Sequence, residues 1–211
     1  MDQPNVIYAG SLLTDQDIYL MKEGSHFKLY EKLGSHLVTV DDTEGVHFAV
    51  WAPNAERVSV IGDFNGWDKK AHPLKVREDE SGIWEGFIPG IGNGTVYKYH
   101  IASRYHGYRV DKGDPFAFRW ETPPKTASVV WDLAYEWGDR EWMTNRYESN
   151  NLEAPISIYE IHYGSWRRNP EGNRYFNCQE MAEHLPGYLN MMDFTHVEFL
   201  PLMEHPFYGS W

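Results

Sequence analysis

The chain has 211 residues, of which 42% are hydrophobic, so it is long enough for one or two domains with a real core. Its formal net charge of -12 argues against a nucleic-acid partner, because a polyanion would be repelled. A single cysteine, Cys178, excludes an intrachain disulfide and any multi-cysteine metal site.

The sequence also predicts where the protein works. No apolar run approaches the roughly 18 residues of a membrane span, and residues 1–10 lack the basic and apolar regions of a secretory signal. We therefore expect a cytoplasmic protein with no membrane partner. The composition is rich in aromatics, with 9 Trp, 14 Tyr and 10 Phe, and such side chains fill cores or stack on flat apolar faces such as those of sugars.

The first part of the chain reads as a short lead-in followed by strands. Residues 1–25 are acidic and partly helical in pattern. Between residues 26 and 132, turn signals rich in Gly, Pro and Asn separate short alternating segments, at 46–51, 57–61, 83–88, 96–101 and 127–131. Regular short strands with such turns predict an all-β sandwich. Within these strands, Trp51, Trp84 and Trp131 are expected in the core.

The pattern then changes. Residues 133–154 are polar and aromatic without a clean period, and we interpret them as a linker packed on its neighbours. Residues 155–162 read as a strand, Asn177 and Glu180 as the capping box of a helix, and residues 195–200 as a second strand. Met181, Leu185, Tyr188, Leu189 and Met192 fall on one helical face, and Pro186 predicts a kink or a break.

Strand, helix and strand form one βαβ unit, whose strands should be parallel. A parallel sheet needs both faces covered, and a complete βα barrel takes about 250 residues. Residues 155–211 are therefore expected to be the incomplete opening of a larger α/β domain, so that the chain is multidomain: an immunoglobulin-like sandwich followed by the truncated start of a (β/α)8 barrel.

Seven segments together resemble the glycogen and starch branching enzymes of the α-amylase superfamily. They are VHFAVWAPNAERVSVIGDFNGW, GIWEGFIPG, YKYHI, RVDKGDPFAF, PPKTASVVWD, YEIHYGSWRR and EHPFYGSW, and the similarity runs from about residue 26 to 211. The resemblance implies a family 48 carbohydrate-binding module over residues 26–132 and the first elements of the catalytic barrel from residue 155. It implies a parent enzyme that cuts an α-1,4-glucan and transfers the segment to a 6-hydroxyl, making an α-1,6 branch in glycogen biosynthesis.

Retaining glycoside cleavage needs two carboxyl groups about 5 Å apart. On position alone, Glu204 is the first nominee because it follows the second barrel strand, where barrel active sites lie; Glu160 and Glu198 lie within strands. The resemblance argues against all three, since the family's catalytic carboxylates follow barrel strands four, five and seven. We therefore expect no catalytic residue in this chain and no branching of amylose by it alone.

The resemblance places other residues near glucan. Loops on the active-site face of the barrel carry Trp166, Arg167, Glu204, His205 and Trp211. Their alternative role is structural, with Arg pairing to carboxylates and Trp packing. The turn Met192-Asp193-Phe194 has Asp where the family often has Gly, and Asp tolerates a positive φ better than most residues.

In the sandwich, the residues that match the module family's sugar platform and its lysine are Trp67 and Lys98, and Tyr108 stands roughly where a second platform is found. The asparagine that related modules use has no clear match, although Ser128 is nearby. The module is therefore expected either to bind glucan at Trp67 or to serve mainly as a packing partner for the barrel.

We expect no cofactor, because phosphate-loop patterns are absent, and no metal site, because the ten His show no HxH or HExxH spacing. The expected partner is an α-1,4-glucan such as glycogen, amylose or a maltooligosaccharide. Two other functions remain open: a stand-alone glycogen-binding module, and part of an isoamylase-type debranching enzyme.

Overall fold

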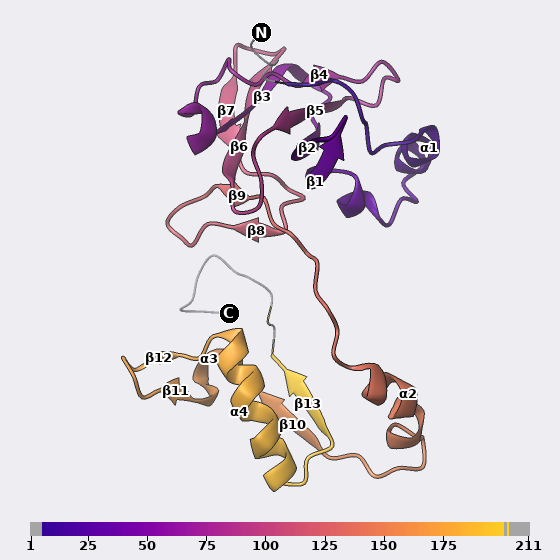
Figure 1. Cartoon of the computed structure of the whole chain (residues 1–211), viewed down its shortest axis with the longest axis vertical. Helices are drawn as coiled ribbons and strands as arrows, with labels where there is room; N and C mark the ends of the chain where they lie inside the picture. Colours follow the sequence, from indigo (N-terminus) through magenta and orange to yellow (C-terminus); the bar gives the residue numbers. More distant parts are fainter. Residues whose placement is uncertain (1–5, 201, 203–211) are drawn as a thin grey trace. The chain divides into compact units, whose positions relative to one another are not determined.

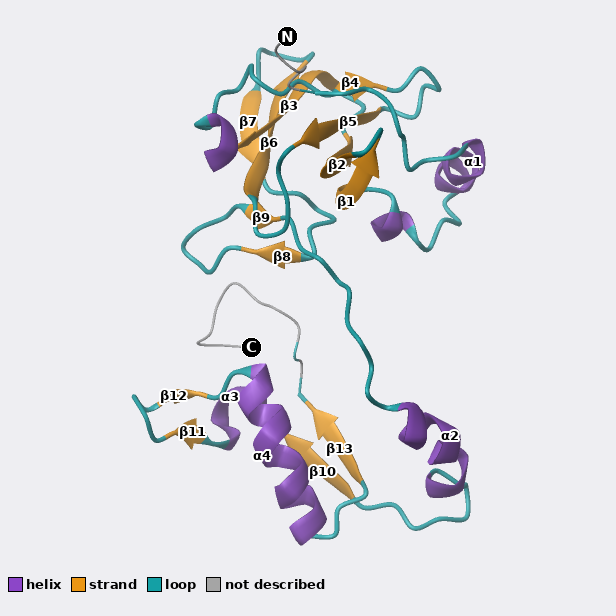
Figure 2. Ribbon diagram, in the orientation of Figure 1, coloured by secondary structure: helices purple, strands orange, loops and turns teal. Residues whose placement is uncertain are grey.

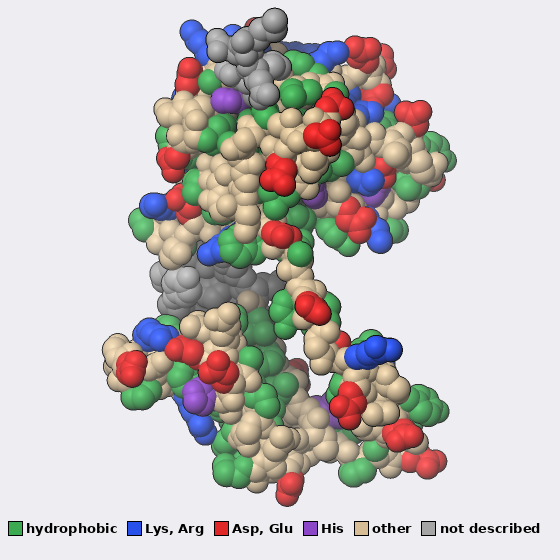
Figure 3. Space-filling model, viewed as in Figure 1, with side chains coloured by type: hydrophobic (Ala, Val, Ile, Leu, Met, Phe, Trp, Pro, Cys, Tyr) green, Lys and Arg blue, Asp and Glu red, His purple; other side chains and the backbone are tan. Residues whose placement is uncertain are grey.

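The structure, a computed structural model, describes residues 6–200 and 202. It divides into a first compact unit, Met1–Tyr135, and a second, Glu136–Trp211 (Figure 1). Glu204, His205 and Trp211 lie outside the described residues. Acidic side chains are scattered over the visible face of each unit rather than gathered in one patch (Figure 3).

The first unit is a β-sandwich, as predicted (Figure 2). One antiparallel sheet has the order β1-β2-β5-β4, and the other has the order β3-β6-β9-β8 with β7 also paired to β6. The strands of the unit are β1 (Gly34–Val40), β2 (Thr43–Trp51), β3 (Ala55–Gly62), β4 (Lys75–Val76), β5 (Ile83–Pro89), β6 (Val96–Ser103), β7 (Arg109–Lys112), β8 (Arg119–Trp120) and β9 (Ser128–Val129). The five predicted strands are all present, whereas β1, β4, β7 and β8 were not predicted.

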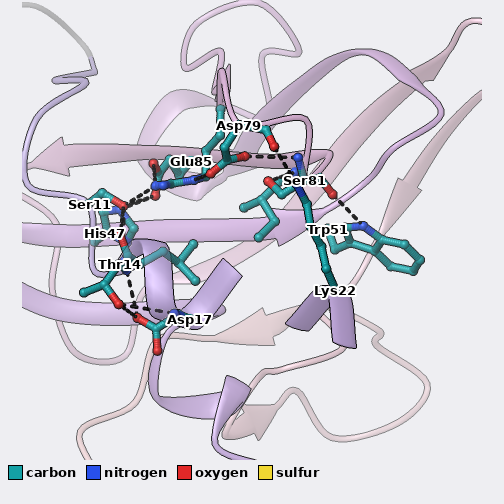
Figure 4. A network of polar contacts seen from close by, with 12 residues as sticks. Ser11, Thr14, Asp17, Lys22, His47, Trp51, Asp79, Ser81 and Glu85 are labelled. Atoms are coloured by element: carbon teal, nitrogen blue, oxygen red, sulfur yellow. Dashed lines mark hydrogen bonds and ion pairs between the residues drawn. The ribbon is translucent and has the colours of Figure 1, made fainter. Parts of the chain in front are cut away.

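The main core lies between the two sheets. Inward residues of β2 and β5 meet inward residues of β3 and β6, and Phe48 packs edge-on against Tyr97 with 5.0 Å between ring centroids. This interlocking of alternate residues is the expected packing of a sandwich. Of the three tryptophans expected in the core, Trp84 is buried, but Trp51 and Trp131 are 56% and 36% exposed. Trp51 ends its strand pointing outward, and its indole donates to the carbonyl of Ser81 (Figure 4).

A buried carboxylate fastens β6 to the turn that follows β7. Asp114 is fully buried, and its Oδ2 accepts hydrogen bonds from Tyr97 at 2.6 Å and Tyr99 at 3.1 Å. Its Oδ1 accepts from the backbone N–H of Phe116, and its own N–H donates to Ser128 Oγ. Burial raises the pKa of the Asp114 carboxyl, although these hydrogen bonds act in the opposite direction.

The lead-in is part of the sandwich. Helix α1 (Asp15–Glu23) begins at the cap Thr14, which forms a capping box with Asp17. Leu13 and Ile18 pack with Leu33, Ala49 and Ile83 in a second buried cluster, together with Leu29 of the short helix η1 (Leu29–Glu31). Residue Ile7 also pairs with Phe87 of β5. The outer face of the first sheet is therefore covered, which explains why β2 is buried on both faces.

Asp17 does more than cap α1. Its carboxylate lies 2.9 Å from His26 Nε2 and 3.5 Å from Lys32 Nζ, and it accepts from the backbone of Thr14. Burial tends to raise the pKa of Asp17, but the hydrogen bonds from Thr14 and His26 and the charge of Lys32 outweigh it and hold the pKa well below its usual range. The pairs tie the helix to the residues that follow it.

The second unit opens with a helix that the sequence did not predict. The segment interpreted as a linker contains α2 (Arg140–Ser149), in which no residue is buried. Its expected packing on neighbouring parts stays a prediction. The remaining elements are β10 (Ile158–Ile161), α3 (Tyr163–Trp166), β11 (Arg168–Asn169), β12 (Arg174–Tyr175), α4 (Cys178–Met191) and β13 (His196–Phe199).

The βαβ prediction is confirmed, with β10 and β13 parallel and α4 between them in the chain. The predicted capping box of Asn177 and Glu180 is present, and Met181 and Leu185 pack with Ile161. Helix α4 runs through Pro186 without a break. Asp193 has φ 58°, so the turn before β13 does use the left-handed conformation. None of the helices in the described ranges is long and apolar enough to cross a membrane.

Replacing the buried carboxylate should weaken the sandwich. In Asp114→Leu, the hydroxyls of Tyr97 and Tyr99 keep their burial but lose their acceptor, and we expect the free energy of unfolding to fall by about 2–5 kcal/mol. Urea unfolding followed by tryptophan fluorescence measures the loss. Tyr99→Phe, which leaves no orphaned donor, should cost about 1 kcal/mol. Unchanged stability of Asp114→Leu would contradict this role.

The pKa of Asp17 predicts a pH dependence. Because its pKa is lower in the folded than in the unfolded protein, Asp17 stabilises the fold above the unfolded value of 3.8 and loses that contribution as the pH falls toward its folded pKa. Asp17→Asn should therefore be less stable than wild type at pH 7, with the difference shrinking below about pH 5. The exposed Asp15→Asn on the same helix is the control, and an Asp17 difference independent of pH would refute the assignment.

The two units should differ in local stability. Only Ile161, Met181 and Leu185 form the buried cluster found among the described residues of the second unit, whereas the first has two larger clusters. We expect amides of β10 and β13 to exchange with solvent faster than those of β2 and β6. Hydrogen exchange measured by mass spectrometry gives the comparison, and equal strong protection in both units would show the expectation to be wrong.

Candidate functional site

Strand β6 presents different chemistry on its two faces. Tyr97 and Tyr99 point into the core, so by strand alternation Lys98 and His100 point to the outer face of the sheet. The register supports this, because Lys98 pairs with Ile61 and His100 pairs with Ser59 of β3. The buried tyrosines thus set the direction of the predicted sugar-binding lysine.

The turn after β3 is shaped by Gly62 and Asn65. A Cβ on Gly62 would lie 2.2 Å from the carbonyl oxygen of Val96, so only glycine fits there. The side chain of Asn65 accepts from the N–H of Gly62 and donates to the carbonyl of Val60, both at 3.0 Å. These bonds close the 3-10 helix η2 (Asp63–Asn65) against the strand that precedes it.

Trp67 ends this turn in an unusual conformation. It has φ 60°, in the left-handed region, where a bulky side chain is an outlier that costs about 1–3 kcal/mol. Its N–H donates to Gly62 O at 2.9 Å, and its indole Nε1 donates to Asp63 Oδ1 at 2.7 Å. The residue is thus held at its backbone and at its indole nitrogen, and it stays 36% exposed. Such strain at an exposed aromatic points to a functional role.

Lys98 lies at the same end of the β3–β6 pair as this turn. Gly62, which accepts from Trp67, pairs with Tyr97, the residue directly before Lys98. The ammonium group of Lys98 donates to Thr126 Oγ1 at 2.7 Å. An ammonium group and an exposed aromatic at one end of a sheet offer hydrogen-bond donors and an apolar face, the two kinds of contact that a sugar ring makes.

Three further polar residues share this outer face and were not predicted. His100 Nδ1 lies 2.6 Å from Asp111 of β7, and Lys69 reaches the same carboxylate at 3.0 Å. Partial burial tends to raise the pKa of Asp111, but the bonds from His100 and Lys69 outweigh it and lower the pKa. The alternation of β6 could have predicted that His100 lies on the outer face. The positions of Lys69 and Asp111 could not be predicted in this way, because they depend on the tertiary fold.

Tyr108 is placed elsewhere. It lies in the turn between β6 and β7, where its carbonyl accepts from the N–H of Ser103 at the far end of β6. Lys98 and Ser103 are five residues apart along the strand, a separation of about 17 Å. Tyr108 is 57% exposed, but the structure does not bring it to the end of the sheet that carries Trp67 and Lys98.

Ser128 does not substitute for the missing asparagine. It is fully buried and its Oγ accepts from the N–H of Asp114. It therefore belongs to the network that holds β6 rather than to an exposed sugar-binding surface.

The two barrel-face candidates that the structure describes, Trp166 and Arg167, contact one another. Trp166 donates its indole N–H to Tyr159 at 3.2 Å, and the guanidinium of Arg167 lies 4.5 Å from the Trp166 ring and 4.9 Å from the Tyr188 ring. Trp166 is partly buried against the cluster around Ile161. Arg167 is exposed and stacked on aromatic faces. Trp166 therefore packs, as in the structural alternative, whereas Arg167 stacks on aromatic rings and pairs with no carboxylate among the described residues.

Two carboxylates in the strands of this unit lie side by side. Glu160 and Glu198 are register partners on β10 and β13, and since their neighbours pack on α4, both point to the opposite face. His162, at the end of β10, contacts Ser165 Oγ at 2.7 Å. Within residues 6–200 and 202, no group of three or more His, Cys, Asp or Glu is arranged to hold a metal ion.

Comparison with known proteins identifies the modules. Residues 32–117 match the family Carbohydrate-binding module 48 (Isoamylase N-terminal domain). In fold, the chain is similar to a Klebsiella pneumoniae pullulanase complexed with maltotriose, with a TM-score of 0.61 and 21% identity over 90% of this chain and 19% of that chain. A GBS pullulanase, SAP, in complex with maltotetraose gives a TM-score of 0.58 at 21% identity, over 82% of this chain and 24% of that one. At these identities the likeness concerns the fold alone.

Similarity in sequence is much higher to another group. The 1,4-alpha-glucan branching enzyme GlgB of Aquifex aeolicus (strain VF5) is 57% identical over 95% of this chain and 32% of its own length. That of Paramagnetospirillum magneticum is 53% identical over 95% of this chain and 27% of its own. The chain thus spans about a third of the length of the curated relatives it matches. It belongs to the 1,4-alpha-glucan branching enzyme family and contains a carbohydrate-binding module 48 over residues 32–117.

Proposed function

We propose that the first unit binds α-1,4-glucan chains, such as glycogen, amylose and maltooligosaccharides, on the outer face of its second sheet. The observation that carries the proposal is Trp67, which is partly exposed, strained at φ 60° and tied through its indole N–H to Asp63. A rigid aromatic offers its face to a sugar at low entropic cost. Lys98 lies at the same end of the sheet and supplies donors for hydroxyl groups.

We further propose that the protein acts in glycogen biosynthesis by branching. In this reaction an α-1,4-glucan is cleaved and the segment is transferred to a 6-hydroxyl to form an α-1,6 branch. The family of the chain supports this proposal, since the relatives at 57% and 53% identity are 1,4-alpha-glucan branching enzymes. The Trp67 surface serves as an anchor that holds a glucan chain, and it does not take part in bond cleavage.

Removing the platform should weaken binding. In Trp67→Ala, the stacking face is lost while the clamp of Asn65 on Gly62 remains, so we expect the affinity for maltoheptaose to fall tenfold or more, in line with about 1–3 kcal/mol for an aromatic platform. Isothermal titration calorimetry measures the change. Trp142→Ala, an equally large truncation of an exposed tryptophan on α2, is the matched control. Equal affinity of Trp67→Ala and wild type would return Trp67 to a purely structural role.

The position of Tyr108 sharpens the test. Because Tyr108 lies about 17 Å along β6 from Lys98, we expect Tyr108→Ala to leave the affinity for maltotriose unchanged. If Tyr108→Ala weakened maltotriose binding as much as Trp67→Ala, the proposed binding surface would be wrong, because maltotriose would also contact the other end of the sheet.

A further inference from the structure

A polar cavity lies on the other sheet of the sandwich. It has a volume of about 250 Å³ and lies where residues 8–11 of the lead-in run beside β4 and β5. Its walls are formed by Tyr8, Ala9, Ser11, His47, Lys75, Val76, Arg77, Glu78, Glu85 and Gly86. None of the residues proposed above for the Trp67 surface lines this cavity.

The polar groups of the cavity are fixed by one another. Arg77 Nη1 donates to Glu85 Oε1 at 2.7 Å and to Ser11 Oγ at 2.6 Å, and Ser11 donates to Glu85 Oε2 at 2.8 Å (Figure 4). Arg77 Nε donates to Asp79. Among the described residues, no hydrogen bond involves Arg77 Nη2, so the N–H groups on this nitrogen can donate to a ligand.

A buried histidine in the wall is left half-satisfied. His47 is 1% exposed, and its Nε2 lies 3.5 Å from Glu85 Oε2. Its Nδ1 is buried and has no hydrogen-bond partner within the described part of the chain. Buried polar atoms are normally paired, so this unpartnered nitrogen on a residue that lines the cavity is an exception that a ligand could account for.

The charges of the wall select a neutral ligand. Lys75 is paired with Glu78 at 3.1 Å, and Arg77 is paired with Asp79 and Glu85. Because Lys75 and Arg77 are each paired with a carboxylate, the wall favours a neutral ligand over an anion, and Tyr8 adds an aromatic ring that is 55% exposed. An aromatic face beside planar carboxylate and guanidinium groups suits a ring with an apolar face and neighbouring hydroxyls.

We propose that this cavity binds one terminal glucosyl unit of an α-glucan, with its ring against Tyr8 and its hydroxyls bonded to Arg77, Glu85 and His47 Nδ1. The inference rests on the proposed function for its ligand class. The volume supports a single unit, since about 250 Å³ is below the roughly 300–1,000 Å³ of pockets that enclose larger ligands. The module then holds a glucan at two places: Trp67 binds an internal part of the glucan, and this cavity binds its terminal unit.

The test is a titration of the whole 15N-labelled chain with maltotriose, followed by NMR. We expect the amides of Ser11 and Gly86 and the ring Nδ1 of His47 to shift, in addition to the indole N–H of Trp67. In Tyr8→Ala, the apparent affinity obtained from the shifts of Ser11 and Gly86 should fall tenfold or more. The affinity obtained from the Trp67 signal should stay unchanged. Tyr19→Ala, an exposed tyrosine of α1, is the matched control.

The outcomes separate the two proposals. Shifts at Trp67 alone overturn the cavity site and keep the proposed function. Shifts at Ser11, Gly86 and His47 alone support the cavity and overturn the Trp67 surface. If the signals of neither site shift, both proposals are overturned. Inorganic phosphate is the second probe, and shifts of the cavity signals with phosphate but not with maltotriose would show that the site takes an anion and would overturn the inference.

Discussion

The buried carboxylate of Asp114 is the contact on which the candidate surface depends. It accepts hydrogen bonds from Tyr97 and Tyr99 in the middle of the core, and so fixes which side chains of β6 point inward. A strand slipped by one residue would exchange its two faces. Because both tyrosines are held, Lys98 and His100 must lie on the outer face, and the Trp67 turn is fastened to the same end of the strand.

Trp67 shows how local strain is maintained by its surroundings. The left-handed backbone is unfavourable for a bulky residue. Three features nevertheless hold Trp67 in this conformation: the glycine required at position 62, the hydrogen bonds of Asn65 and the bond from the indole to Asp63. The same bonds that impose the strain also stop the ring from collapsing onto the sheet. A preorganised aromatic gives up little entropy when a ligand stacks on it.

Much of the fold could be predicted from local pattern. Alternation located β2, β3, β5 and β6, and the Asn177 capping box located α4, because each signal lies within a few neighbouring residues. Strand β1 mixes polar and apolar residues and gains its order from pairing with β2, and Trp51 and Trp131 are exposed because they end or follow strands. For the site, the resemblance to the module family indicated Trp67 and Lys98. The positions of Lys69, Asp111 and Tyr108 depend on how β7 pairs with β6, which one strand's sequence does not encode.

The central claim is that a glucan lies on the Trp67 surface, and a crystal structure of the chain with maltotriose tests it most directly. The account predicts a glucosyl ring stacked on the indole of Trp67, with Lys98 Nζ within hydrogen-bond distance of a hydroxyl group and the Trp67–Asp63 bond intact. Maltotriose bound elsewhere on the first unit, with the Trp67 ring left uncovered, would contradict it.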